Sequence, residues 1–209
     1  MPKSGPFEEY TVRYEEWFEK NKYVYESELQ AVKALMPPNL KGLEVGVGSG
    51  RFALHLGIGY GVEPSKKMRE LAIRRGINVV DGVGEELPYE EGSFDVVLMV
   101  TTLCFLDDVE KAFGEVYRVL KKGGCFINGF VDKNSCLGKL YQRHKNENVF
   151  YKIARFYSTE QVVSYLNAAG FYDFECKQTI FQDLNKINAV EPVKEGFGEG
   201  SFVVVRAKK

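Results

Sequence analysis

The sequence has no excess of either charge and no long apolar run. Its 28 lysines and arginines are matched by 29 aspartates and glutamates, and the formal net charge is −1. Such a chain has no broad positive field that would attract a nucleic-acid backbone. The longest apolar run, from Val96 to Leu106, holds two threonines and is about half the length that a membrane-spanning helix needs. We therefore expect neither a nucleic-acid partner nor a membrane segment.

Paired cysteines and a leader-like N-terminus are also missing. The four cysteines lack the C-x-x-C spacing of zinc and redox sites, and two lie in apolar runs where a small buried side chain is expected. The N-terminal residues MPKSGPFEEYTVRYEE are polar and acidic, whereas a signal peptide is basic and then apolar. These absences predict a reduced, cytoplasmic setting and no metal site.

A regular alternation of strand and helix patterns fills most of the chain. Strands are expected at 43–47, 59–63, 77–80, 94–100 and 124–131, and helices at 50–56, 65–75 and 108–121. A capped helix from Ser158 to Ala169 and strands at 171–177 and 202–207 follow. Alternation of this kind predicts an α/β fold in which helices cover both faces of a doubly wound, mostly parallel sheet, here of seven strands.

The most informative motif is LEVGVGSGRF, at Leu43–Phe52. Its glycines, Gly46, Gly48 and Gly50, remove the side chains that would keep a ligand away from the backbone between a strand and a helix. The start of that helix favours an anionic or carboxylate-bearing ligand. The dinucleotide fingerprint G-x-G-x-x-G would need glycine at Arg51. The motif thus indicates a nucleotide-type ligand of another class, the alternative being a glycine turn that binds nothing.

The observed spacing, E-x-G-x-G-x-G beginning at Glu44, resembles motif I of the class I S-adenosylmethionine-dependent methyltransferases, most closely the small-molecule, type 11-like members. The similarity extends over about 41–122, and RVLKKGG at 118–124 is similar to the turn that leads into the fifth strand of that family. The resemblance implies a Rossmann-like methyltransferase fold with S-adenosylmethionine as cofactor. It assigns cofactor contacts to Glu44, Gly46, Gly48 and Gly50.

The resemblance also implies cofactor contacts for two residues at the ends of strands. Glu63, in GVEPS, stands where the family places a carboxylate that accepts both ribose hydroxyls, although a Glu at this point could also merely cap the next helix. Thr101 follows the fourth strand, where the family's backbone often touches the cofactor, and a plain loop residue is the alternative. Glu44 could likewise be a strand residue paired with a nearby basic side chain.

The segment GVGEELPY at 82–89 is similar to the family's G-D-A-E-x-L-P-F run, which contacts adenine. This implies adenine contacts by Val83, Gly84 and Glu85. Val83 replaces the usual Asp, so the contact to the adenine amino group must come from Glu85, from Asp81, or be absent.

The length and the 44% hydrophobic content suit one domain, 1–209. We divide it into an N-terminal helical extension (1–38), a cofactor-binding core (39–131), an inserted cap (132–157) and a C-terminal helix with strands (158–209). The cap leaves the sheet at the carboxyl end of a strand, where α/β folds bind ligands, so we expect it to be a substrate lid.

Candidates for the substrate pocket are aromatic residues of the two covering segments. They are Tyr14 and Trp17 in the N-terminal helices and Tyr141 and Tyr151 in the cap. Ordinary helix packing is the alternative for the first pair. The catalytic residue is unknown, with His144 as the one candidate base and a solvated loop histidine as its alternative. No D-P-P-Y or N-P-P-Y string follows the fourth strand, which argues against methylation of exocyclic base amines.

These observations predict an enzyme that transfers a methyl group from S-adenosylmethionine to a small-molecule acceptor. A protein or RNA methyltransferase and a non-catalytic cofactor-binding module are the alternatives. A recognition domain or basic face, which would favour the former, is not evident.

Overall fold

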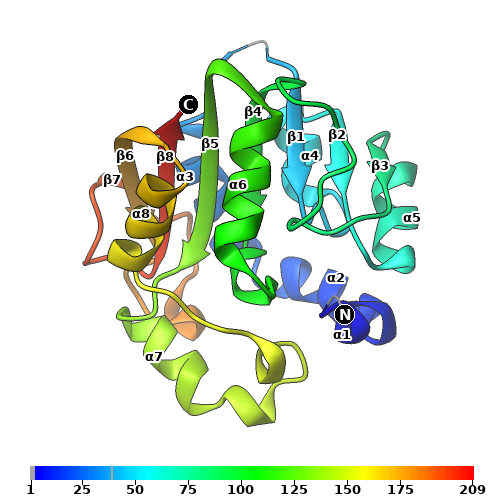
Figure 1. Cartoon of the computed structure of the whole chain (residues 1–209). Coiled ribbons are helices and arrows are strands. Elements are labelled where there is room, and N and C mark those ends of the chain that lie inside the picture. The colour runs from blue at the N-terminus through cyan, green and yellow to red at the C-terminus, as the bar shows by residue number, and fades with distance from the viewer. Residues whose placement is uncertain (1–2, 39) are drawn as a thin grey trace.

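The computed structural model describes residues 3–38 and 40–209, and an eight-stranded sheet forms its centre (Figure 1). The strands are β1 Gly42–Val45, β2 Tyr60–Val62, β3 Asn78–Val80, β4 Phe94–Val100, β5 Leu120–Val131, β6 Tyr172–Thr179, β7 Lys194–Glu195 and β8 Phe202–Lys208. Their order in the sheet is β3-β2-β1-β4-β5-β8-β6-β7. The first five strands are parallel, whereas β8 pairs antiparallel with β5 and β6, and β7 pairs antiparallel with β6.

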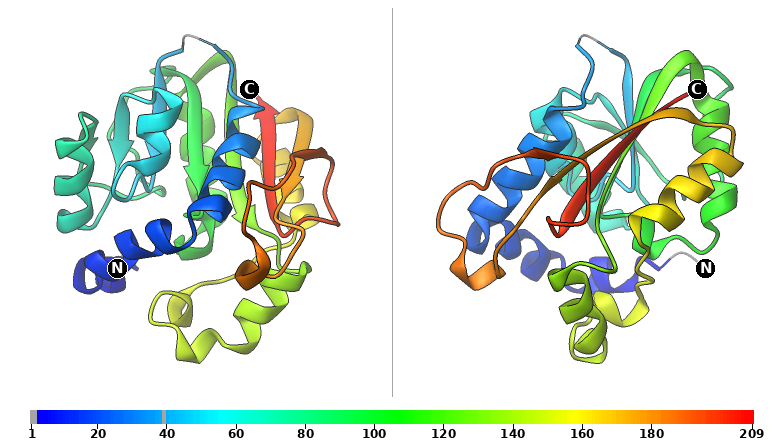
Figure 2. Two further views of the ribbon diagram at one scale, coloured as in Figure 1. Left: turned by 180° about the vertical axis from the view of Figure 1, so that it is seen from behind. Right: turned by 90° about the vertical axis from the view of Figure 1, so that its left-hand side faces the viewer.

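Helices cover both faces of this sheet (Figure 2). One face carries α3 Lys22–Lys33, α4 Arg51–Leu56 and α5 Lys66–Arg74, and the other carries α6 Val109–Val119 and α8 Thr159–Ala168. Alternate residues of β4 enter the two cores, because Val96 and Leu98 face the first group of helices and Val97 and Met99 face the second. A strand buried on both faces has the continuous apolar sequence seen at 96–100.

The predicted α/β, doubly wound sheet is confirmed, and its seven expected strands are all present. The structure adds the two-residue edge strand β7, which is too short to give a sequence signal. It lies in the connection between β6 and β8, which also contains the 3₁₀ turn η4 Leu184–Lys186. This connection reaches α3, where the backbone N–H of Glu191 donates to Ser27 Oγ at 2.8 Å.

The expected N-terminal helical pattern is divided into two helices, and a further helix precedes it. They are α1 Gly5–Glu9, α2 Thr11–Lys20 and α3. The division between α2 and α3 lies at Asn21, whose side chain donates to the Trp17 carbonyl at 2.9 Å and so ends α2. Consequently α2 lies across the carboxyl ends of the parallel strands, together with α1, while α3 packs on the sheet (Figure 1).

The 132–157 segment has regular structure that its sequence did not predict. It consists of α7 Cys136–Arg143 and two 3₁₀ turns, η2 Lys145–Glu147 and η3 Tyr151–Ile153. Asp132 fixes its base, because its buried carboxylate accepts from the backbone N–H of Asn134 at 2.6 Å and from both the N–H and the hydroxyl of Thr159, at 2.8 and 2.5 Å. These bonds tie the start of the cap to the first residue of α8.

No helix in the described ranges, 3–38 and 40–209, is long and apolar enough to cross a membrane.

We predict that Asp132→Ala lowers the free energy of unfolding by about 3 kcal/mol, because three donors, two of them on the buried Thr159, lose a charged acceptor. Urea denaturation followed by circular dichroism measures the change. Asp183→Ala is the matched control, since Asp183 pairs only with Lys186 on the surface, and it should cost less than about 0.5 kcal/mol. Equal losses in the two variants would show that Asp132 is not the anchor of the cap.

Candidate active site

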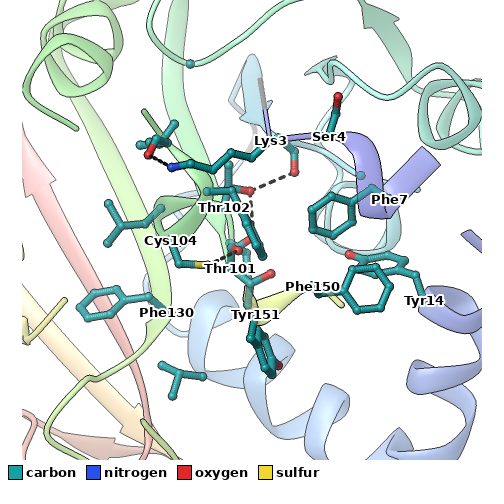
Figure 3. Close-up of a pocket in the computed structure, with 18 of the residues that line it drawn as sticks. Lys3, Ser4, Phe7, Tyr14, Thr101, Thr102, Cys104, Phe130, Phe150 and Tyr151 are labelled. Atoms are coloured by element: carbon teal, nitrogen blue, oxygen red, sulfur yellow. Dashed lines mark hydrogen bonds between the residues drawn. The ribbon is translucent and has the colours of Figure 1, made fainter. Parts of the chain in front are cut away.

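A cavity of about 870 Å³ lies at the carboxyl ends of β1, β2 and β4 (Figure 3). Its floor is made by the loops that follow these strands and by residues 82–85, and its roof by α1, α2 and the cap. This is the end of an α/β sheet at which ligands bind.

The glycine turn after β1 forms part of the floor. Gly46 and Gly48 line the cavity with φ angles of +67° and +54°, which side chains other than glycine rarely adopt. A Cβ on Gly48 would lie 3.3 Å from the Tyr14 hydroxyl oxygen, so the roof approaches the bare backbone here. Gly50 points elsewhere, because its Cβ would meet Ile77 at 2.4 Å under the sheet edge. It shapes the turn and does not line the cavity.

Glu63, at the end of β2, joins the glycine turn to the next loop. Its carboxylate accepts from the backbone N–H of Gly48 at 2.9 Å and from that of Ser65 at 2.8 Å, and the side chain lines the cavity. Burial raises the pKa of Glu63 to about 6, although these two N–H groups and the Arg69 guanidinium oppose the shift. Helix α5 is capped instead by the hydroxyl of Ser65, which accepts from Met68 N. Capping therefore does not account for the position of Glu63.

Glu44 lies beneath the turn, outside the cavity. It is 2% exposed, and its Oε2 has no hydrogen-bond partner within the described part of the chain. Burial raises its pKa well above the usual range, and the neighbouring Glu63 carboxylate adds to this effect. No basic side chain pairs with it among these residues, so the paired-strand alternative does not describe its surroundings.

The 82–85 segment lines the cavity beside Glu63. Glu85 Oε1 accepts from the backbone N–H groups of Asp107 and Asp108, at 2.7 and 3.2 Å, and so holds the loop that leads into α6. Asp81 does not line the cavity, and its carboxylate pairs with Arg69 at 2.8 Å. Val83 and Gly84 present backbone and apolar surface to the cavity.

The exit of β4 packs directly on the glycine turn. Thr101 lines the cavity with an unusual φ of +52°, and Thr102 Oγ1 donates to the Gly46 carbonyl at 3.1 Å. The 3₁₀ turn η1, Leu103–Phe105, follows. Its Cys104 also lines the cavity; the thiol donates to the Thr101 carbonyl at 3.4 Å, and burial raises its pKa to about 12.

Aromatic rings from three segments form the roof. Phe7 of α1, Tyr14 of α2 and Phe150 of the cap gather at one side of the cavity in Figure 3, and the Phe7 and Phe150 ring centroids are 5.2 Å apart. Burial raises the pKa of Tyr14 above its usual range, and the Glu63 carboxylate adds to this effect. Trp17 lines the cavity from the same helix as Tyr14. The N-terminal helices and the cap therefore meet over the cavity.

A second aromatic group lies within the cap. Tyr141 and Tyr151 line the cavity with ring centroids 4.3 Å apart, and Phe156 lies 5.8 Å from Tyr151. All four aromatic residues expected in the substrate pocket thus line one cavity.

His144 does not line it. The residue caps the C-terminus of α7, its side chain is 56% exposed, and its ring nitrogen contacts Glu147 at 3.0 Å on the surface. Its place outside the cavity favours the alternative, a solvated histidine.

Sequence reasoning overlooked Glu28 of α3, which lines the cavity and is 5% exposed. A signal was present, because Glu28 lies at helical spacing between the buried Val24 and Val32. A carboxylate in the apolar stripe of a helix is removed from water, so its presence there suggests a partner or a ligand.

No group of three or more His, Cys, Asp or Glu side chains is placed to hold a metal ion anywhere in the described ranges. The absence of a metal stays a prediction.

Comparison with known proteins identifies the family. Residues 43–128 match the family model described as a methyltransferase domain. An uncharacterized protein of Methanocaldococcus jannaschii is 43% identical, covering 97% of this chain and 98% of the relative. A solved S-adenosylmethionine-dependent methyltransferase of Thermotoga maritima, described as a possible histamine N-methyltransferase, is 51% identical over 97% of both chains, with a TM-score of 0.95.

A more distant structure shows the same fold with ligands. Haemonchus contortus phosphoethanolamine N-methyltransferase 2, in complex with phosphomonomethylethanolamine and S-adenosylhomocysteine, has a TM-score of 0.63 at 18% identity, covering 88% of this chain and 52% of that one. The Rossmann-like methyltransferase fold and the cofactor implied by the glycine turn are confirmed by these comparisons. Because the similarity to the Thermotoga protein extends over nearly the whole length of both chains, this chain belongs to the S-adenosylmethionine-dependent methyltransferases.

Proposed function

We propose that this methyltransferase transfers the methyl group to a small-molecule acceptor enclosed between the glycine turn and the cap. The observation that carries the proposal is the roofed cavity: its volume, about 870 Å³, lies toward the upper end of the range of about 300–1,000 Å³ for ligand pockets. Such a volume suits a cofactor together with a small acceptor. The contact between Phe7 and Phe150 joins the N-terminal helices to the cap over the cavity.

Two further observations support a small acceptor. The chain has a net charge of −1 and therefore no broad field for RNA. The Thermotoga relative, similar over nearly its whole length, is described as a possible histamine N-methyltransferase, and histamine is a small molecule. We also keep as predictions the cytoplasmic location and the absence of a nucleic-acid partner.

The residues of the floor fit S-adenosylmethionine. Each oxygen of the Glu63 carboxylate uses one lone pair for a backbone N–H, which leaves a second lone pair on each for the two ribose hydroxyls. The bare backbone at Gly48 allows the methionine end to lie close, beneath Tyr14, while Gly46 lines the same turn and leaves room for the Thr102 side chain. When bound, the cofactor supplies an electrophilic methyl group on a positively charged sulfur.

We assign the adenine ring to the surface of Val83 and Gly84. The carboxylate of Glu85 already accepts two backbone N–H groups, so it is less suited to the adenine amino group than the sequence suggested. Thr101, at the β4 exit, completes this wall through its strained backbone. Glu44 and Gly50 act in this proposal by holding the shape of the turn from below.

The remaining task of the protein is to align the acceptor and exclude water. The aromatic roof can align the acceptor and exclude water, because Phe7, Tyr14 and Phe150 come from three separate segments whose rings meet over the cavity. The surface position of His144 gives it no part in this arrangement.

A first prediction concerns Gly48. Gly48→Ala should weaken S-adenosylmethionine binding at least about tenfold, or about 1.4 kcal/mol, because the added methyl group stands where the cofactor approaches the backbone. Gly57→Ala is the matched control: Gly57 has a φ of +69° at the other end of α4 and open space around it. Isothermal titration calorimetry should show near-normal affinity for the control, and equal losses would attribute the effect to backbone strain alone.

A second prediction concerns pH. The ribose hydroxyls would donate to the ionised Glu63 carboxylate, so its pKa, about 6 in the free protein, must fall on binding. Affinity is then fully present above pH 6 and is lost as the pH falls through that value, by about tenfold between pH 7.5 and pH 5. Calorimetry at the two pH values measures this. Glu63→Gln should bind weakly at both, and an unchanged pH dependence in that variant would assign the titration to another group.

A third prediction tests the acceptor class. Incubation with S-adenosylmethionine and a panel of small amines, phenols and thiols should release S-adenosylhomocysteine, whereas protein and RNA mixtures should not. Phe150→Ala should lower the turnover of the best acceptor by about tenfold or more by opening the roof to water. His144→Ala should retain wild-type turnover, because its ring lies outside the cavity. Transfer only to protein or RNA would overturn the small-molecule proposal.

A further inference from the structure

Glu28 is a buried carboxylate without a partner. It lies on α3, is 5% exposed and lines the cavity. Within 3–38 and 40–209 its oxygens accept no hydrogen bond and form no ion pair. A carboxylate that is removed from water usually gains hydrogen bonds or a counter-ion, because unpaired burial is costly.

Three other buried carboxylates of this protein follow that rule, whereas Glu44, outside the cavity, keeps one oxygen without a partner among the described residues. Glu63 accepts two backbone N–H groups, and Asp132 accepts three donors at the base of the cap. Glu191 accepts from Phe181 N and from the Gln182 amide. Glu28 differs from these because it faces the cavity, so its missing partner would come from a ligand.

Tyrosines of the cap line the same cavity as Glu28. Its charge helps to raise the pKa values of Tyr141 and Tyr151 of the cap and of Tyr25 on its own helix, after the larger effect of burial. No cationic side chain offsets its own burial, which raises the pKa of Glu28 to about 8. Tyr141, Tyr151 and Phe156 form a continuous group of rings, and ring faces attract cations.

We propose that Glu28, with Tyr141 and Tyr151, forms the acceptor subsite and that it selects a primary or secondary amine in its ammonium form. The inference rests on the proposed function, because it names the substrate class of the same cavity. A carboxylate beside aromatic rings supplies both the counter-charge and the cation–π surface that an ammonium group needs once it leaves water.

Glu28 can also remove the proton that an ammonium group must lose before its nitrogen can attack the methyl group. Glu28 accepts one proton from the bound ammonium, and the freed nitrogen lone pair forms the N–CH₃ bond. The S–CH₃ bond breaks with its electron pair left on sulfur, which becomes a neutral thioether. The methylated product leaves as an ammonium ion, and the proton on Glu28 passes to solvent.

Binding without turnover tests the subsite. Protein saturated with S-adenosylhomocysteine is titrated with phenethylamine and with its neutral counterpart, 2-phenylethanol. The fluorescence of Trp17, the single tryptophan, which lines the cavity, reports binding. We expect the wild type to prefer the amine at least about tenfold, and Glu28→Gln to lose this preference while its affinity for S-adenosylhomocysteine stays within about twofold.

Glu16→Gln is the matched control, since Glu16 also lines the cavity but lies exposed at its rim. This variant should keep the preference for the amine. Equal binding of amine and alcohol by the wild type would overturn the proposal without any variant. A Glu28→Gln protein that loses affinity for S-adenosylhomocysteine but keeps the amine preference would also overturn it, because Glu28 would then serve the cofactor.

The two proposals fail separately. A wild type that binds the amine through Glu28 but transfers no methyl group to any small molecule would contradict the proposed function and support the subsite. A wild type that methylates phenols or thiols and ignores amines would support the proposed function and overturn the subsite.

Discussion

The bridge made by the Glu63 carboxylate holds this site together. It joins the backbone of Gly48, in the turn after β1, to that of Ser65, at the start of α5. Two loops from neighbouring parallel strands are thereby fixed at one edge of the sheet, and the glycine turn keeps the left-handed conformation that exposes its backbone. The cost is a buried carboxylate with a raised pKa, which hydrogen bonds from a ribose would offset.

The roof depends on a different kind of contact. Aromatic rings from α1, α2 and the cap meet above the bridge, although the cap lies more than a hundred residues from the two helices in the chain. Ring contacts of this kind are apolar and tolerate small shifts, whereas the Asp132 carboxylate fixes the base of the cap through three directed hydrogen bonds. The cap is thus anchored at its base, and among the described residues ring packing joins it to the N-terminal helices. Such an arrangement suits a cover that must admit an acceptor and release a product.

The carboxylates that line the cavity differ in how many hydrogen-bond partners they have. Glu63 and Glu85 have backbone partners, but Glu28, which lines the cavity with Tyr141 and Tyr151, has no hydrogen-bond or ion-pair partner among the described residues. Within one cavity the protein therefore offers a partly satisfied carboxylate suited to hydroxyl groups and an unsatisfied one suited to a cation. In our proposals this difference in chemistry distinguishes the cofactor end of the cavity from the acceptor end.

The sequence by itself determined the sheet, the glycine turn and the family, because hydrophobic periodicity and the spacing around Glu44 are local properties of the chain. It also singled out the aromatic residues Tyr14, Trp17, Tyr141 and Tyr151, which line one cavity in the structure. Only the tertiary structure showed that Gly50 and Glu44 lie below the cavity and that His144 lies on the surface. The direction of a side chain depends on packing between distant segments, which no local pattern contains. The same reason hid Glu28: its place in the apolar stripe of α3 acquires a meaning only when the cap brings Tyr141 and Tyr151 beside it.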